Sequence, residues 1–191
     1  CIRDRANSQL AMAIASKADS DALDALMKAT MSYDGSAGII SYNGIVDAVD
    51  KFEEEINTEK VMFVHPNQVT QLRKDPDFIS ADKYTGDVVM TGEVGKIANC
   101  RIVPSRKVKL AGGAYTCPIV KLEQDGETED ELPALTIYLK RQVMVEGERK
   151  PRTATTEVTA NEFYAVGLTN EAKVVLAKFA KSAPADPAPT A

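Results

Sequence analysis

Residues 61–78, VMFVHPNQVTQLRKDPDF, decide the fold class of this chain. An apolar run, VMFV, stops at His65-Pro66, and the amphipathic segment that follows ends at a second proline, Pro76. Proline is tolerated in the first turn of a helix, where its missing N–H has no partner to lose, and it blocks a helix that would continue into it. The stretch therefore predicts a buried strand followed directly by a short helix at 66–74.

The overall composition is that of an ordinary globular protein. The 191 residues are 44% hydrophobic and 27% charged, enough to bury one core or two small lobes. A net charge of -5 disfavours a protein whose main task is to grip phosphate backbones, because such proteins usually carry a basic balance. No apolar run approaches the roughly 20 residues that a membrane-spanning helix needs.

The cysteines predict neither a metal site nor a disulfide framework. Cys1, Cys100 and Cys117 are odd in number, and none is spaced as CxxC. We therefore predict free thiols. The sequence also begins with cysteine rather than methionine, so we expect it to be part of a longer protein.

Helical patterns fill most of the first half of the chain. An alanine-rich stripe at helical spacing, without glycine or proline, predicts one long helix at 3–30. The glycines that follow predict a turn at 33–42. A second helix is predicted at 43–55, for which Ser41 or Asn43 can provide the N-cap.

The second half of the chain alternates short β-prone runs with turns. The predicted strands lie at 88–90, 96–103, 119–122, 134–145, 153–159, 163–168 and 173–177. An acidic stretch, 123–131, and a basic stretch, 146–152, are predicted as loops. Residues 181–191, rich in alanine and proline, are predicted to form a disordered tail.

No stretch of the sequence pairs a nucleophile with a base. His65 is the only histidine, and we predict that it caps the following helix or packs under it. TGEVGK at 91–96 lacks both the first glycine and the final Ser or Thr of a phosphate-binding loop. The acidic stretch 123–131 lacks the alternating ligands of a calcium loop. We therefore predict no catalytic residue, no cofactor and no metal site, and hence no enzyme.

Three passages nevertheless occur in an informative order. They are the long helix at 3–30, HPNQVTQLRKDPDF followed by GEVGKIANCRIVPS, and IYLKRQVMVEGERK with the later NEFYAVGLTNEAKVV. This order, over roughly residues 4–178, resembles the major capsid (coat) proteins of tailed bacteriophages. The resemblance implies an α+β protein with the Hong Kong phage-type coat fold. That fold has a long spine helix, a peripheral-like lobe with long antiparallel strands, and an axial-like lobe whose central sheet is flanked by helices.

The resemblance also implies a domain division. Residues 1–35 and 134–180 would form the peripheral-like lobe, and 36–133 the axial-like lobe. In the family, an N-terminal arm and an extended hairpin precede the spine helix and clasp neighbouring subunits. This sequence starts at the spine helix, so we expect it to be truncated at the N-terminus and unable to close a shell by itself.

The function implied by the resemblance is that of a structural subunit of a phage or prophage icosahedral head. Such a subunit assembles with copies of itself into hexameric and pentameric capsomers and encloses the double-stranded DNA genome, which it contacts only non-specifically. Scaffold and portal proteins are further expected partners, and no membrane is involved. Assembly is expected in the bacterial host cytoplasm, and the final location is the virion capsid.

The two oppositely charged loops are the candidate contacts between subunits. The acidic candidates are Glu123, Asp125, Glu127, Glu129 and Asp130, and the basic candidates are Arg149, Lys150 and Arg152. Because the two loops carry opposite charges, we expect these contacts to be salt-sensitive, with each exposed ion pair contributing only about 0–1 kcal/mol.

Two alternatives remain open at the level of sequence. An encapsulin-type nanocompartment shell shares the implied fold but carries enzyme cargo. A small-molecule-binding or enzymatic α+β domain would instead need a concave site around His65 or residues 92–96.

Overall fold

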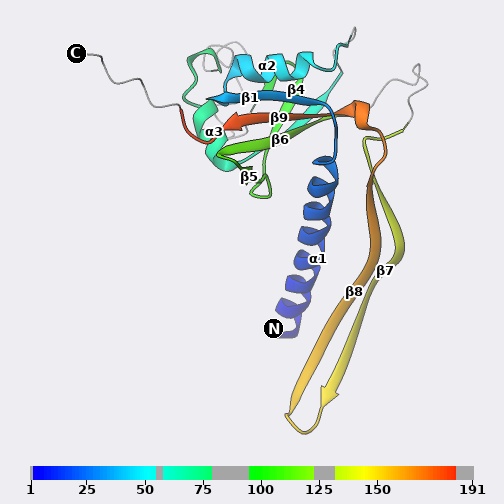
Figure 1. The fold of residues 1–191 in the computed structure, drawn as a ribbon. Coiled ribbons are helices and arrows are strands. Elements are labelled where there is room, and N and C mark those ends of the chain that lie inside the picture. Colours follow the sequence, from blue (N-terminus) through cyan, green and yellow to red (C-terminus); the bar gives the residue numbers. More distant parts are fainter. Residues whose placement is uncertain (1, 55–57, 79–94, 123–131, 184–191) are drawn as a thin grey trace.

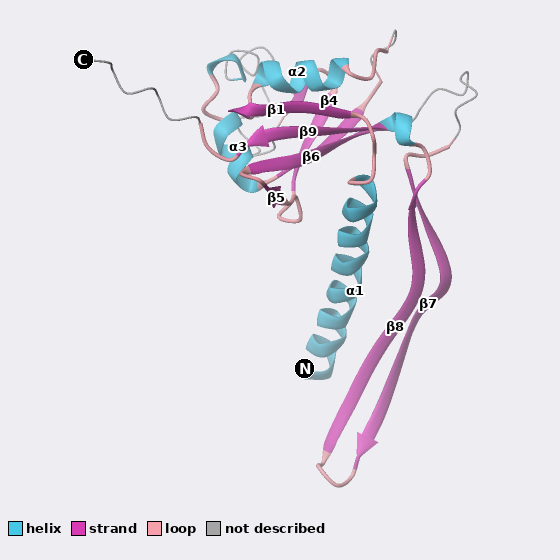
Figure 2. Ribbon diagram, in the orientation of Figure 1, coloured by secondary structure: helices cyan, strands magenta, loops and turns pink. Residues whose placement is uncertain are grey.

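The computed structural model describes residues 2–54, 58–78, 95–122 and 132–183. A lobe built on a seven-stranded sheet, here called the sheet lobe, carries a long projection, here called the arm (Figure 1). The arm consists of helix α1 (Ile2–Leu26) and a hairpin of β7 (Leu135–Lys150) and β8 (Thr155–Leu168). Helix and hairpin leave the sheet lobe on the same side and run next to each other (Figure 2). The predicted α+β class is confirmed.

The sheet of the sheet lobe is mixed. Its strands are β1 (Ser32–Ile39), β2 (Lys60–Val64), β3 (Lys96–Ile97), β4 (Cys100–Pro104), β5 (Leu110–Ala111), β6 (Ala114–Lys121) and β9 (Val174–Ala180). They follow the order β1-β9-β6-β2-β4-β3, and β5 pairs with β6. The pairs β1/β9 and β2/β4 are parallel, whereas β6 is antiparallel to both β2 and β9. The middle of the sheet is therefore assembled from strands that are distant in sequence.

Two helices bury one face of this sheet. Helices α2 (Tyr42–Asp50) and α3 (Pro66–Leu72) place Ile45 and Leu72, both fully buried, against Met62 of β2. Ser41 caps α2, because its Oγ accepts a hydrogen bond from the Gly44 N–H at 3.1 Å. Of the two predicted caps, Ser41 is thus the one that the structure uses.

The strand and short helix predicted from residues 61–78 are confirmed. Pro66 occupies the first turn of α3, and His65 is its N-cap, with Nδ1 accepting from the Asn67 N–H at 3.2 Å. The Gln68 side chain accepts from the His65 N–H at 2.9 Å and completes a capping box. The imidazole also stacks on the Tyr115 ring, with centroids 4.7 Å apart. The histidine therefore has the predicted structural role.

The turn predicted at 33–42 is wrong, because residues 32–39 form strand β1. The glycines indicated a turn, but Gly35 serves close packing within the sheet. A Cβ on Gly35 would lie 2.9 Å from the Tyr33 ring, 3.0 Å from the Lys178 carbonyl oxygen and 3.0 Å from the Phe179 ring. Pairing with β9 thus overrides the low intrinsic strand preference of glycine.

The basic loop predicted at 146–152 is also wrong. Strand β7 continues to Lys150, and only the four residues 151–154 turn the chain into β8. Residues 155–159 and 163–168, predicted in two separate strands, belong to one strand, β8. Exposed charged residues resemble a loop in the sequence, but here they pair across the hairpin, for example Arg149 with Thr156.

Further boundaries differ from the prediction, among them the end of α2, which lies at Asp50 rather than at residue 55. The strand predicted at 96–103 is a tight hairpin of β3 and β4, because Ala98 and Asn99 adopt positive φ values of 48° and 57°. Helix α1 ends at Leu26 rather than at residue 30. Strand β9, which the expected domain division groups with the arm, pairs between β1 and β6 in the sheet lobe.

Several predictions concern residues outside the described ranges. They are Cys1, the strand at 88–90, the first four residues of TGEVGK, the acidic stretch 123–131 and tail residues 184–191. At the start of the predicted tail, the Lys181 N–H donates to the Gly113 carbonyl and the Lys181 carbonyl accepts from the Gln71 side chain. Residue 181 is therefore anchored to the sheet lobe.

Candidate assembly surfaces

The hairpin of the arm exposes large apolar side chains over most of its length. Seven of them are between 44% and 59% exposed: Ile137, Tyr138, Leu139, Val143, Met144, Val145 and Phe163. Monomeric proteins rarely expose contiguous apolar surface on this scale, and an isolated two-stranded hairpin is at best marginally stable in water. The hairpin therefore has the properties of a surface that another protein covers.

The register of the hairpin separates these residues into two faces. Leu139 lies opposite Tyr164, whose hydroxyl donates to Asp21 of α1 at 2.8 Å, so this face is directed toward the helix. Tyr138 lies opposite Ala165 on the other face, which Phe163 shares because it is two residues from Ala165. The outer face, with Tyr138 and Phe163, thus has no cover from the described part of the chain.

The inner face is covered only in part. An apolar groove of about 500 Å³ remains between α1 and the hairpin. Its helix wall includes Leu10 and Ile14, and its hairpin wall includes Val143, Val145 and Ala160. Both faces of the hairpin therefore offer apolar area to a neighbour.

Polar contacts link the last turns of α1 to the sheet lobe and to the hairpin. Asp24 pairs with Lys109 of the sheet lobe at 2.6 Å, and Asp21 accepts from Tyr164 of the hairpin. Hydrogen bonds from Lys17 and then from Tyr164 hold the pKa of Asp21 below its usual value. The same bond to Asp21 raises the pKa of Tyr164 to about 12, so this contact persists through the neutral range. These contacts supplement the packing of Leu23 and Leu26, which are buried at the end of α1.

The predicted basic contact residues lie at the far end of the hairpin. Arg149 and Lys150 end β7, and Arg152 is exposed in the tip turn. Lys150 already pairs with Glu157 of the same hairpin at 2.6 Å. The acidic candidates at 123–131 lie outside the described residues, so pairing between the two charged stretches stays a prediction.

Sequence reasoning missed the apolar faces of the hairpin. The run LTIYLKRQVMV is β-prone with apolar residues on both faces, and such a pattern is typical of a buried strand. The available signal was the combination of this pattern with a long strand that has only one partner. That combination indicates burial between chains rather than within one.

The reactive side chains of the sheet lobe are enclosed. Cys100 and Cys117 are buried free thiols, as predicted, and burial raises the pKa of each to about 12. Among the described residues, no group of three or more His, Cys, Asp or Glu side chains is placed to hold a metal ion. No helix in the described ranges is long and apolar enough to cross a membrane.

Comparisons with known proteins give the family of this chain. A family model described as phage capsid protein matches residues 2–177. The major capsid protein of Staphylococcus phage phiMR11 is 31% identical over 169 residues, which are 87% of this chain and 56% of that protein. This chain therefore spans little more than half the length of that curated relative.

Two solved structures share the fold. The head structure of Helicobacter pylori bacteriophage KHP40 matches with a TM-score of 0.73 at 9% identity, over 95% of this chain and 69% of that one. The holo-SrpI encapsulin complex from Synechococcus elongatus matches with a TM-score of 0.52 at 11% identity, over 80% of this chain and 53% of that one. With the sequence match over residues 2–177, these findings show that the chain belongs to the phage capsid protein family.

Proposed function

We propose that this chain forms most of the structural subunit of a phage or prophage icosahedral head. The subunit assembles with its own copies into hexameric and pentameric capsomers, and the shell encloses double-stranded DNA. The observation that carries the proposal is the hairpin with two apolar faces in a chain whose residues 2–177 match the capsid family. Because the chain spans 56% of its curated relative, the behaviour of the whole protein is part of the proposal.

Within the subunit, we assign the arm to the peripheral-like lobe and the sheet lobe to the axial-like lobe. The strand pairing supports moving residues 174–180 from the expected peripheral-like lobe into the axial-like one, because β9 lies between β1 and β6. The three crossings between the lobes are then 27–31, 132–134 and 169–173.

The physical character of the surfaces fits assembly into a closed shell. An apolar hairpin that contacts a different patch on the next copy makes head-to-tail contacts, which close into rings when the rotation permits. Many weak contacts of this kind add up while each stays reversible. The net charge of -5 is compatible with a shell that encloses DNA without binding it tightly. The product would reside in the virion capsid after assembly in the host cytoplasm, with scaffold and portal proteins as further partners.

The two alternatives receive less support. The encapsulin match has the lower TM-score, 0.52 against 0.73. Genes next to this one, portal and terminase or a cargo enzyme, would separate these two kinds of shell. An enzymatic site at His65 has no support, since this imidazole caps α3 and stacks on Tyr115.

Electron microscopy of the full-length protein, with and without its scaffold, tests the proposal. We expect rings or shells from the natural sequence and none from the double variant Tyr138→Lys, Phe163→Glu. Leu110→Glu is the matched control, because Leu110 is 45% exposed but lies on β5 of the sheet lobe, outside the hairpin. If the natural full-length protein forms neither rings nor shells under either condition, the proposal is wrong.

A further inference from the structure

The central strands of the sheet lobe carry apolar side chains on both faces. Met62 of β2 and Ile102 of β4 are buried in the core under α2 and α3. Phe63 and Val103, on the same two strands, point to the opposite face and are only half-buried. β2 and β4 are parallel, and parallel strands with both faces buried usually have a continuous run of apolar residues in their sequence. The sequence of β2 therefore predicts that both faces of the strand are buried. The described residues bury the second face only in part.

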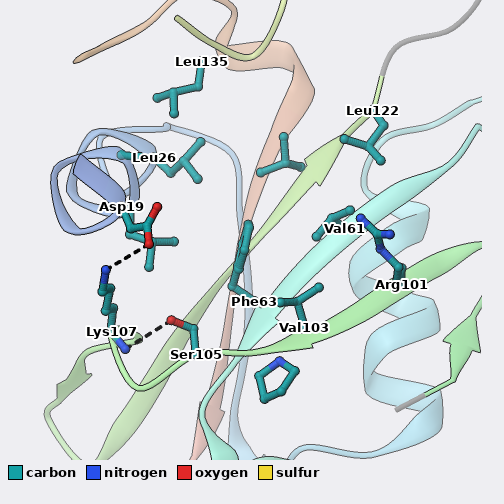
Figure 3. Close-up of a pocket in the computed structure, with 14 residues that line it drawn as sticks. Asp19, Leu26, Val61, Phe63, Arg101, Val103, Ser105, Lys107, Leu122 and Leu135 are labelled. Atoms are coloured by element: carbon teal, nitrogen blue, oxygen red, sulfur yellow. Dashed lines mark hydrogen bonds and ion pairs between the residues drawn. The ribbon is translucent and has the colours of Figure 1, made fainter. Parts of the chain in front are cut away.

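A cavity of about 540 Å³ lies on this second face, beneath the last turns of α1 (Figure 3). Phe63, Val103 and Val120 form its floor on the sheet. Leu23 and Leu26 of α1 form one wall. Arg101 lines the side of the cavity that is opposite α1 (Figure 3).

Two described cations, Lys107 and Arg101, line the cavity. Lys107 is occupied, since its Nζ contacts the Ser16 carbonyl at 2.6 Å and Asp19 at 3.2 Å. Arg101 is exposed on β4 and lies opposite Lys96 in the register of β3 and β4. Glu59, the nearby carboxylate, is paired with Lys96 at 2.8 Å. Arg101 therefore forms no ion pair within the described ranges.

We propose that this cavity docks a short segment of another polypeptide in which apolar side chains flank a carboxylate. The apolar side chains lie on Phe63 and Val103, and the carboxylate pairs with Arg101, whose planar guanidinium can donate two parallel hydrogen bonds to it. This docking is independent of the function proposed above, because it rests on the sheet lobe alone.

The size of the cavity favours a segment over a second folded copy. Stable interfaces between folded proteins bury about 800 Å² on each partner, over a surface far broader than this recess. A peptide, by contrast, is held by a few anchor side chains in a groove. A concave apolar floor with an exposed arginine at its rim matches the second kind of recognition.

Selection of random peptides displayed on filamentous phage, with the 191-residue chain as bait, tests this inference. We expect enrichment of peptides with apolar residues next to Asp or Glu. A fluorescein-labelled copy of the most enriched peptide should bind Arg101→Glu about tenfold more weakly than the natural sequence, as expected for loss of a charged hydrogen bond. Lys51→Glu, the same charge change on an exposed residue beside α2, should leave its affinity unchanged.

A second measurement on the unmodified protein guards against a folding effect of the substitution. The peptide should shift the methyl resonances of Val103 and Leu122, which line the cavity, and not those of Ile45, a buried residue of α2. No enrichment, equal affinity for Arg101→Glu, or resonance shifts elsewhere would overturn the inference. So would concentration-dependent self-association that Arg101→Glu abolishes, because the cavity would then belong to a second copy.

Discussion

The sheet lobe and the arm contain similar kinds of apolar residues but use them in opposite ways. In the sheet lobe, Met62 and Phe179 are at most 1% exposed. In the arm, Tyr138 and Val145 are each 59% exposed. Burial of the apolar side chains in the sheet lobe drives folding. The exposed apolar side chains of the arm can instead be buried by a partner, which would favour binding. Fold stability and assembly are therefore separable properties of this chain, located in different lobes.

The largest effect that tests this separation is expected from Phe179→Ala in the sheet lobe. The Phe179 ring packs 6.1 Å from the Tyr33 ring and would contact a Cβ placed on either Gly35 or Gly44. Removing it leaves a cavity that the backbone around these glycines cannot fill, and should cost about 3–5 kcal/mol of unfolding free energy in urea titrations. A loss below about 1 kcal/mol would mean that this core is not the source of stability.

A buried ion cluster in the sheet lobe provides the next test. Glu54, 11% exposed, contacts Lys60 at 2.6 Å and Lys121 at 2.8 Å, and Lys60 itself is 1% exposed. Glu54→Gln leaves Lys60 buried without its counter-charge and should lower the free energy of unfolding by about 3 kcal/mol. Glu59→Gln, which removes an exposed partner of Lys96, is the matched control and should have little effect.

The same cluster predicts a dependence of stability on pH. Burial acts to raise the pKa of Glu54, but hydrogen bonds from Lys121, Lys60 and Thr58 outweigh it and hold this pKa below the ordinary value of 4.5. A lowered folded-state pKa gives stability that is present above pH 4.5 and is lost as the pH falls through the folded value. Acid unfolding below pH 4.5 should therefore be shallower in Glu54→Gln, and parallel curves for both proteins would contradict this.

Substitutions on the exposed face of the arm should reduce assembly and leave the free energy of unfolding nearly unchanged. Phe163, 50% exposed on the outer face of the hairpin, makes a cation–π contact with Arg141 at 4.3 Å. Phe163→Ala should change the free energy of unfolding by no more than about 0.5 kcal/mol, as is usual for exposed positions. The same substitution should reduce the fraction of full-length protein that sediments as assemblies. A large loss of stability without any change in assembly would remove the distinction between the two lobes.

How far the sequence predicted the fold differs between the lobes for a physical reason. The strand and helix at 61–78 followed from local chemistry, because His65-Pro66 fixes the corner by capping. Strand β1 was missed because Gly35 allows close packing against Phe179, a contact between residues more than a hundred positions apart. The end of β7 was missed because pairing with β8, and not its own charged residues, makes it a strand.

The candidate site was predicted even less completely. The candidate contact residues Arg149 and Lys150 were predicted in a loop and lie at the end of β7, and the exposure of the apolar hairpin faces was not predicted. Periodicity shows which residues are apolar and cannot show whether the same chain covers them. Sequence periodicity therefore cannot predict burial that a neighbouring copy provides.

The contacts between the two lobes should have the smallest effect of all. Asp24 of α1 and Lys109 of the sheet lobe pair at 2.6 Å, but their side chains are 50% and 64% exposed. Asp24→Asn should cost at most about 0.5 kcal/mol at low salt and nothing measurable near 1 M salt, where the screening length falls to about 3 Å. Asp50→Asn, on the exposed side of α2, provides a control for the change in net charge. A salt-resistant loss well above this limit would show that the arm is fixed to the sheet lobe by its ion pairs rather than by Leu23 and Leu26.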